Sequence, residues 1–258
     1  MSKNKKARST KLFFLLVVFP VLAIAISFYA ILKGVQNYIT SSDYFKIRDL
    51  RAEGIADARY VDLMREEILG GNIFRLDTLK LSEKIRRRFP TFYSVTVNRV
   101  LPSQLWIVAK ERIPVAEIKR DLYYVFDVDG VVIGGLSSSG TLNLPLIVGL
   151  ESQLPRIKIG TEYSLSTLRR ALVLAKALRD YNDFVVSRID ASDPGNLVFY
   201  LADEVQIKIG DRDFENKISP LSSILHSIGG DLSNVKYIDL RPKEPVVATK
   251  NNVKNKKP

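Results

Sequence analysis

The most constraining feature of the chain is an uncharged run at residues 12–32, LFFLLVVFPVLAIAISFYAIL. A helix of this length measures roughly 31 Å, enough to cross a bilayer hydrocarbon core of about 30 Å. Charged residues stop at Lys11 and resume at Lys33. Pro20 is compatible with a membrane helix. We therefore predict a single transmembrane helix over residues 12–32.

Two alternatives to an uncleaved anchor remain open. Ala23 and Ala25 have the small-x-small spacing of a signal-peptide cleavage site. The apolar run nevertheless continues past Ala25 and exceeds the usual signal-peptide core of about 7–15 residues. A buried helix of a soluble domain is the second alternative, but the run has no polar face to meet water. The anchor is the favoured interpretation.

The formal net charge of +11 is concentrated at the two ends of the chain. Five cations precede the apolar run with no acidic residue among them: Lys3, Lys5, Lys6, Arg8 and Lys11. The positive-inside bias therefore predicts a cytoplasmic N-terminus and an exported body, a single-pass type II topology in the cell membrane. Residues 250–258 carry four further lysines, and the rest of the chain is nearly neutral. This distribution argues against nucleic-acid binding.

The chain offers little for catalysis or cofactor binding. It has no cysteine, which excludes disulfides, thiolate metal sites and cysteine nucleophiles. The single histidine, His226, has no second imidazole to complete a metal site. Asp127-x-Asp129-Gly130 is similar to the start of a calcium loop, but position twelve is Ser138 instead of Glu, so we predict a hairpin turn there. We expect no catalytic residue, no cofactor and no metal.

Hydrophobic periodicity predicts an α+β fold after a polar connector at residues 33–43. In the first module we expect the order strand, helix, helix, strand, strand, at residues 46–53, 60–69, 78–89, 92–100 and 104–110. In the second half we expect strands at 123–126, 131–133, 144–147, 185–189, 197–201, 205–209, 235–241 and 244–249, with helices at 166–181 and 214–228. Pro220 removes a helical hydrogen bond, so we expect the regular part of the last helix to begin near Ser219.

Several strings of the sequence resemble one known family. The first module is similar to the polypeptide-transport-associated (POTRA) fold, with Phe45-Lys46-Ile47, residues 72–77 (NIFRLD) and Pro90 at the corresponding places. Residues 102–116 resemble the signature P-x-x-L-x-I-x-V-x-E-R-x-P-V-A, at which the POTRA of the bacterial division proteins FtsQ and DivIB passes into their β-domain. YYVFDVDGVVI, IKIGDRDFENKI and YIDLR follow in the family's order, so the resemblance spans residues 12–248.

The resemblance implies a domain plan and a function. The plan is a cytoplasmic basic tail (1–11), a transmembrane helix (12–32), a connector (33–43), a POTRA domain (44–112), an FtsQ-type mixed β-sheet domain with flanking helices (113–249) and a disordered basic tail (250–258). The implied function is that of a non-enzymatic scaffold at the division septum. It would bind FtsB/DivIC-like and FtsL-like bitopic proteins and link early to late septation proteins.

The last strand is the expected docking site. A sheet edge exposes unpaired backbone groups that can accept an extended segment of another protein. The resemblance assigns this role to Arg241, Pro242, Val246, Val247 and Ala248, with Arg241 available to a carboxylate. Pro242 and Pro245 cannot donate hydrogen bonds, so pairing there is interrupted. A plain closing strand is the alternative.

Two other functions remain as alternatives. A POTRA-bearing scaffold for polypeptide transport or outer-membrane assembly usually strings several POTRA units before a β-barrel, and this chain has room for neither. An anchored envelope enzyme acting on glycan would require paired carboxylates in a cleft. Replacing Asp127, Asp129 and Glu111 one at a time would test the enzyme.

Overall fold

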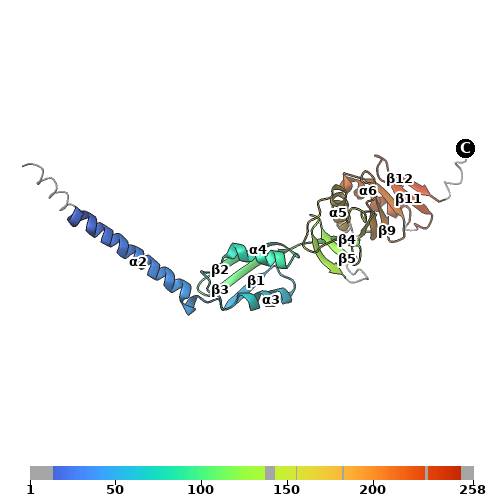
Figure 1. Ribbon diagram of the computed structural model, residues 1–258. Helices are drawn as coiled ribbons and strands as arrows, with labels where there is room; N and C mark the ends of the chain where they lie inside the picture. The colour runs from blue at the N-terminus through green and yellow to red at the C-terminus, as the bar shows by residue number, and fades with distance from the viewer. Residues whose placement is uncertain (1–13, 137–142, 155, 182, 230–231, 251–258) are drawn as a thin grey trace, which may run out of the picture. The chain divides into compact units, whose positions relative to one another are not determined.

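The computed structural model describes residues 14–136, 143–154, 156–181, 183–229 and 232–250 (Figure 1). The chain forms two compact units, one of residues 1–85 and 95–109 and the other of residues 86–94 and 110–258. Helices and mixed sheets occur together, which confirms the predicted α+β class.

The first unit begins with a long apolar helix. A short π-helical stretch, η1 (Phe14–Val18), leads into α2 (Phe19–Ser41). This is one helix long and apolar enough to cross a membrane, and its side chains over residues 16–37 are exposed. Residues 33–41 of the predicted connector are helical, because α2 continues to Ser41. The hydroxyl groups of Thr40 and Ser41 donate back to the carbonyls of Gln36 and Asn37 at the end of this helix.

The predicted strand–helix–helix–strand–strand order is confirmed. A single 3-10 turn, η2 (Asp43–Phe45), precedes β1 (Asp49–Glu53), α3 (Ala58–Ile68), α4 (Thr78–Arg88), β2 (Phe92–Val100) and β3 (Gln104–Glu111). The sheet order is β1-β3-β2, with β1 parallel to β3. Asp57 starts α3 because its carboxylate accepts the backbone N–H of Arg59. Apolar residues three and four apart, such as Leu81 and Ile85, turn one face of each helix toward the core.

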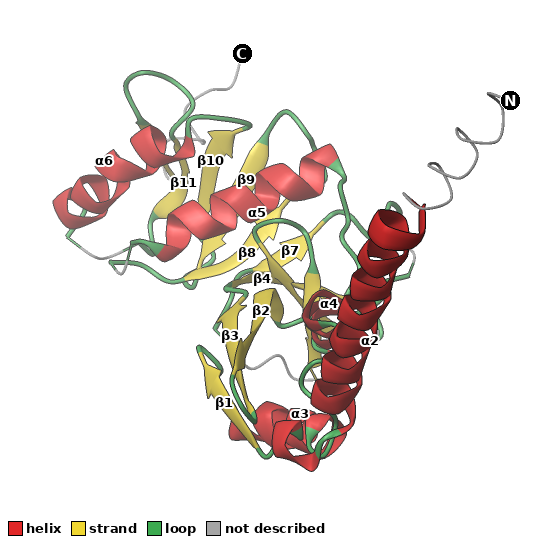
Figure 2. Cartoon of the chain, turned by 90° about the vertical axis from the view of Figure 1, so that its left-hand side faces the viewer, coloured by secondary structure: helices red, strands yellow, loops and turns green. Residues whose placement is uncertain are grey.

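The second unit contains one nine-stranded sheet in the order β12-β11-β10-β9-β8-β7-β4-β5-β6. The strands are β4 (Pro114–Lys119), β5 (Tyr123–Asp127), β6 (Val132–Leu136), β7 (Leu146–Val148), β8 (Val186–Asp190), β9 (Leu197–Leu201), β10 (Gln206–Gly210), β11 (Val235–Asp239) and β12 (Val246–Thr249). Figure 2 shows α5 (Ser166–Arg179) and α6 (Phe214–Ser227) on one face of this sheet. The periodicity did not predict β4, because four consecutive residues of that strand, 115–118, are buried and no alternation shows.

The core of this unit lies between the sheet and the two helices. Ile189, Phe199, Ile207 and Ile238 stand opposite one another on four neighbouring strands and are fully buried. The predicted apolar stripe of α5 packs on them and is buried along its length: Leu168, Ala171, Leu172, Ala175 and Leu178. Both described helices of this unit lie on that one face, and β12 is at one edge of the sheet.

The predicted start of α6 near Ser219 is wrong. The helix begins at Phe214, after Asp213 in the left-handed region at φ 60°, and Pro220 lies in its interior. Phe214, Ile218 and Leu221 are all buried, and Ile218 and Leu221 completely so. Burial of these side chains stabilises the helix on both sides of the proline and compensates for the missing hydrogen bond.

Candidate partner-docking edge

Strand β12 forms one edge of the nine-stranded sheet. It pairs antiparallel with β11, with Val246 opposite Asp239, Val247 opposite Ile238 and Ala248 opposite Tyr237. Val246 is 50% exposed and Val247 38% exposed. Two β-branched apolar residues on an open edge are the arrangement that strand addition by another chain requires.

The backbone of β12 presents hydrogen-bonding groups to this edge. The backbone N–H of Lys250 donates to the carbonyl of Asn234, at 2.9 Å, on the side of β11. Because backbone groups alternate in direction along a strand, those of Val246 and Ala248 also point toward β11. The N–H and C=O of Val247 and Thr249 therefore point away from β11, toward the open edge.

The two sides of the edge differ in chemistry. Val247 shares a face with Ile238, on the side that α6 covers. Val246 and Ala248 share the other face with Tyr237, over whose ring the ammonium group of Lys208 lies at 4.1 Å. A segment added to β12 would thus place alternate side chains on an apolar side and on a polar, aromatic side.

Arg241 is held within the chain. Its Nε and Nη2 donate to Oδ1 and Oδ2 of Asp239, at 2.8 and 2.6 Å, and its Nη1 donates to Oδ1 of Asn196 at 3.0 Å. Asp239, the last residue of β11, thus gives Arg241 a carboxylate within the chain, and pairing of Arg241 with a partner's carboxylate stays a prediction. Arg241 braces the connection from β11 to β12, and Pro242 follows it, exposed, in that connection. Pro242 and Pro245 both lie outside the strands, so they interrupt no pairing within β11 or β12.

The ion pair between Arg241 and Asp239 gives a pH-dependent prediction. The hydrogen bond from the Arg241 guanidinium lowers the pKa of Asp239 below its ordinary value of 3.8. Because the folded-state pKa is depressed, the stabilisation is complete above pH 3.8 and is lost as the pH falls through the folded-state value. We expect Arg241→Gln to destabilise the second unit by about 1 kcal/mol at neutral pH, allowing for solvent screening. Urea unfolding should show this difference shrinking in acid, and a difference independent of pH would contradict it.

Two motifs that are separate in the sequence meet at a buried ion pair. Arg112, from the E-R-x-P-V-A string, contacts the Asp127 carboxylate through Nη1, and Asp129 Oδ2 lies 3.5 Å from the same nitrogen. The other oxygen of Asp127 accepts the backbone N–H of Val131 at 2.8 Å. The predicted hairpin turn is confirmed, with Gly130 at φ +85° where a Cβ would lie 2.5 Å from a backbone oxygen. Asp127 therefore has a structural role, because it pairs with Arg112 and accepts the backbone N–H of Val131.

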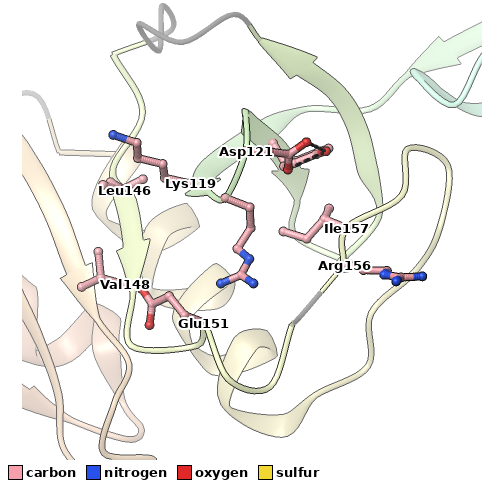
Figure 3. A pocket seen from close by; sticks show the side chains of 9 residues that line it. Lys119, Asp121, Leu146, Val148, Glu151, Arg156 and Ile157 are labelled. Atoms are coloured by element: carbon pink, nitrogen blue, oxygen red, sulfur yellow. Dashed lines mark hydrogen bonds between the residues drawn. The ribbon is translucent and has the colours of Figure 1, made fainter.

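A hollow lies at the turn between β4 and β5 (Figure 3). Its volume is about 750 Å³, and its lining includes the carboxylates of Asp121 and Glu151. Asp121 accepts a hydrogen bond from the Tyr124 hydroxyl at 3.2 Å, and Glu151 accepts one from the backbone N–H of Gly149 at 3.1 Å. Both carboxylates have structural partners, so this hollow gives no positive indication of paired acid and base groups.

Some of the remaining predicted site residues lie outside the part of the chain that the structure describes. Lys3, Lys5, Lys6, Arg8 and Lys11 fall outside the described residues, and so do residues 251–258 of the predicted basic tail. Lys250, the first residue of that tail, is attached to the sheet, because its ammonium group donates to the Ser233 carbonyl at 2.6 Å. His226 is an exposed residue of α6 whose Nδ1 lies 3.0 Å from the Ser222 carbonyl.

Sequence reasoning missed the partners that surround the edge. Asp239 precedes Arg241 by two residues, and this spacing, which places both side chains on one face of an extended chain, was a usable signal. Tyr237 and Lys208 come from strands far apart in the sequence, and only the parallel pairing of β10 with β11 brings them together.

Comparisons with known proteins agree with this architecture. Residues 116–241 match the family described as "Cell division protein FtsQ/DivIB, C-terminal". The cell division protein FtsQ of Syntrophotalea carbinolica is 32% identical over 210 residues, covering 77% of this chain and 72% of that protein. The chain belongs to the FtsQ/DivIB family. FtsQ of Geotalea daltonii is 27% identical over 226 residues, covering 84% of this chain and 80% of its own length.

A solved structure is also similar. The major extracytoplasmic domain of DivIB from Geobacillus stearothermophilus aligns with 47% of this chain and 98% of that domain, at 16% identity and a TM-score of 0.32. Membership of the FtsQ/DivIB family, together with the long apolar α2, indicates a single-pass membrane protein. The FtsQ/DivIB family match ends at residue 241, so it includes Arg241 and stops before β12. The docking role of Arg241, Pro242, Val246, Val247 and Ala248 stays a prediction.

Proposed function

We propose that this protein is a non-enzymatic scaffold of the division machinery that binds its partner by strand addition to β12. The supporting observation is the open edge of β12, with exposed Val246 and Val247 and outward-directed backbone groups. The proposed partner is an FtsB/DivIC-like bitopic protein, accompanied by an FtsL-like protein. Holding this pair would connect early and late septation proteins.

The proposed arrangement in the membrane follows from the charge distribution. The five cations of residues 1–11 would keep the N-terminus in the cytoplasm, and residues 44–249 would lie on the other side of the membrane, at the septum. The domain plan, with the POTRA domain at residues 44–112 and the β-domain at 113–249, forms part of this proposal. In it, the POTRA domain follows the anchor and the β-domain carries the docking edge.

The edge also specifies what kind of segment would fit. Val247 and Thr249 each offer one N–H and one C=O, so an extended segment of about four residues would form the added strand. Its residues facing α6 would be apolar to match Val247 and Ile238. Its residues on the opposite face would lie beside Val246 and Ala248, the neighbours of Tyr237 on that face.

A cross-linking experiment in dividing cells tests the proposal. A photo-reactive amino acid at Val247 should capture an FtsB/DivIC-like single-pass protein, identified by mass spectrometry. The matched control is Val173, which is 43% exposed on the outer surface of α5 and far from the edge. Capture at Val247 and not at Val173 supports docking at β12. Equal capture at both positions, or capture of this partner at Val173 alone, would contradict it.

A further inference from the structure

Residues 72–77, one of the strings that resemble the family, attach the first module to the end of α2. The side-chain Nδ2 of Asn72 donates to the carbonyl of Ile39, in the last turn of α2, at 3.0 Å. The side-chain oxygen of the same Asn72 accepts the backbone N–H of Phe74 at 2.9 Å. Asn72 thus fixes the segment beside the C-terminal end of the long apolar helix.

Contacts with β2 and with the start of α4 also fix residues 72–77. Arg99 of β2 donates through Nε to the carbonyl of Ile73, at 2.9 Å, and through Nη2 to that of Leu76, at 2.5 Å. Ile73 is fully buried, and the carboxylate of Asp77 accepts the N–H groups that begin α4. These contacts leave Phe74 and Arg75 exposed at a segment whose backbone is fixed.

An exposed aromatic cluster lies at this point. The rings of Tyr44 and Phe45 are 5.1 Å apart, and those of Phe45 and Phe74 are also 5.1 Å apart, both in edge-to-face arrangements. Tyr44 is 59% exposed and Phe74 36% exposed. Aromatic residues next to a membrane span are typical of the bilayer–water interface.

The length of α2 determines how far this cluster stands from the bilayer. If the hydrocarbon core ends at Leu32, the nine residues from Lys33 to Ser41 raise the helix end by roughly 13 Å. The headgroup layer occupies about 5–8 Å of that distance on each side of a bilayer. The remaining gap is within the Debye length of about 8 Å at physiological salt, and a long arginine side chain spans it.

The charges around the cluster favour an anionic surface. Residues 43–48 and 72–77 together carry Lys46, Arg48 and Arg75 against Asp43 and Asp77. Asp43 pairs with Lys46 at 2.9 Å, and Asp77 caps α4. Among the described residues, the Arg75 guanidinium has no side-chain partner and is available to a phosphate group.

We propose that Tyr44, Phe74 and Arg75 form a foot that rests on the anionic phospholipid headgroups beside the membrane helix. The proposal depends on α2 crossing the bilayer and is independent of docking at β12. The foot would fix the height and orientation of the first module above the membrane. Arg75 would contact lipid phosphates, while the two rings would lie just above the headgroup layer.

Spin labelling of the full-length chain in vesicles tests the foot. The chain has no cysteine, so Phe74→Cys creates a unique attachment site for a nitroxide. The control is Glu53→Cys, an exposed residue at the far end of β1 in the same module. In vesicles of phosphatidylcholine with phosphatidylglycerol, the label at position 74 should collide less often with a water-soluble paramagnetic complex than the label at position 53. Adding Arg75→Gln should reduce this protection, because loss of one cation near an anionic surface weakens the contact equilibrium about fivefold.

Two results would overturn the foot. One is a label at position 74 that stays as accessible as the label at position 53 in anionic vesicles. The other is protection that Arg75→Gln leaves unchanged. A second reporter, Tyr44→Cys, keeps the test available if the variant at position 74 does not fold. Binding of an FtsB/DivIC-like partner is measured on the same Arg75→Gln sample and should not change, which separates failure of the foot from failure of the docking edge.

Discussion

Replacing Val247 with proline is expected to abolish partner binding and to leave the nine-stranded sheet folded. The N–H of Val247 points to the open edge, so proline removes a donor that only an added strand would use. Proline is tolerated on edge strands when its nitrogen faces solvent. In the complex, the missing donor and the proline ring would both oppose the incoming backbone, and the loss should exceed about tenfold in Kd.

Co-purification of the full-length chain with an FtsB/DivIC-like protein measures this effect. Val247→Thr is the matched control, because it keeps both the N–H and the β-branched shape, and its binding should stay within about threefold of the original. Ala248→Pro is expected to differ from Val247→Pro, because it removes a donor directed at β11. It should lower the unfolding temperature of the protein as well as partner binding. Unchanged binding by Val247→Pro would reject the edge as the docking site.

Local patterns in the sequence predicted most elements of the fold. Strands β2 and β9 have the predicted bounds, and α5 buries the predicted stripe, because helical and strand periodicities depend only on residues close in sequence. The ends of elements were less predictable. Ser41 ends α2 nine residues beyond the apolar run, in a polar segment where hydrophobic periodicity gives no signal.

Contacts between residues that are distant in the sequence determine the features that local patterns did not predict. Pro220 is tolerated inside α6 because Ile218 and Leu221 are buried against strands distant in sequence. The edge position of β12 was predicted from its place at the end of the fold, but the pairing of Arg241 with Asp239 and Asn196 needed the folded chain. No local pattern predicts the contact between Arg112 and Asp127. Asp127 lies fifteen residues further along the chain, in β5.

This buried pair leads to the largest expected effect on stability. The side chain of Asp127 is 4% exposed and that of Arg112 14% exposed. Removing Asp127 leaves the buried Arg112 charge with only the half-exposed Asp129 carboxylate, 3.5 Å away. Loss of one partner of a buried ion pair typically costs about 3–5 kcal/mol. Asp127→Ala also deprives the backbone N–H of Val131 of its side-chain acceptor. We expect the unfolding temperature of the second unit to fall by about 10 °C.

Two further variants distinguish the pair from general damage at the turn. Asp129→Ala removes a carboxylate that is 50% exposed and 3.5 Å from the same Arg112 nitrogen, so it should cost less than about 1 kcal/mol. The double replacement Arg112→Met with Asp127→Leu removes both charges and should recover most of the loss, because apolar groups of similar volume replace the buried pair well. Calorimetry of the three variants checks this order. An Asp127→Ala protein of unchanged stability that had lost a hydrolytic activity would instead favour the anchored envelope enzyme, because the carboxylate would then act in chemistry and not in the fold.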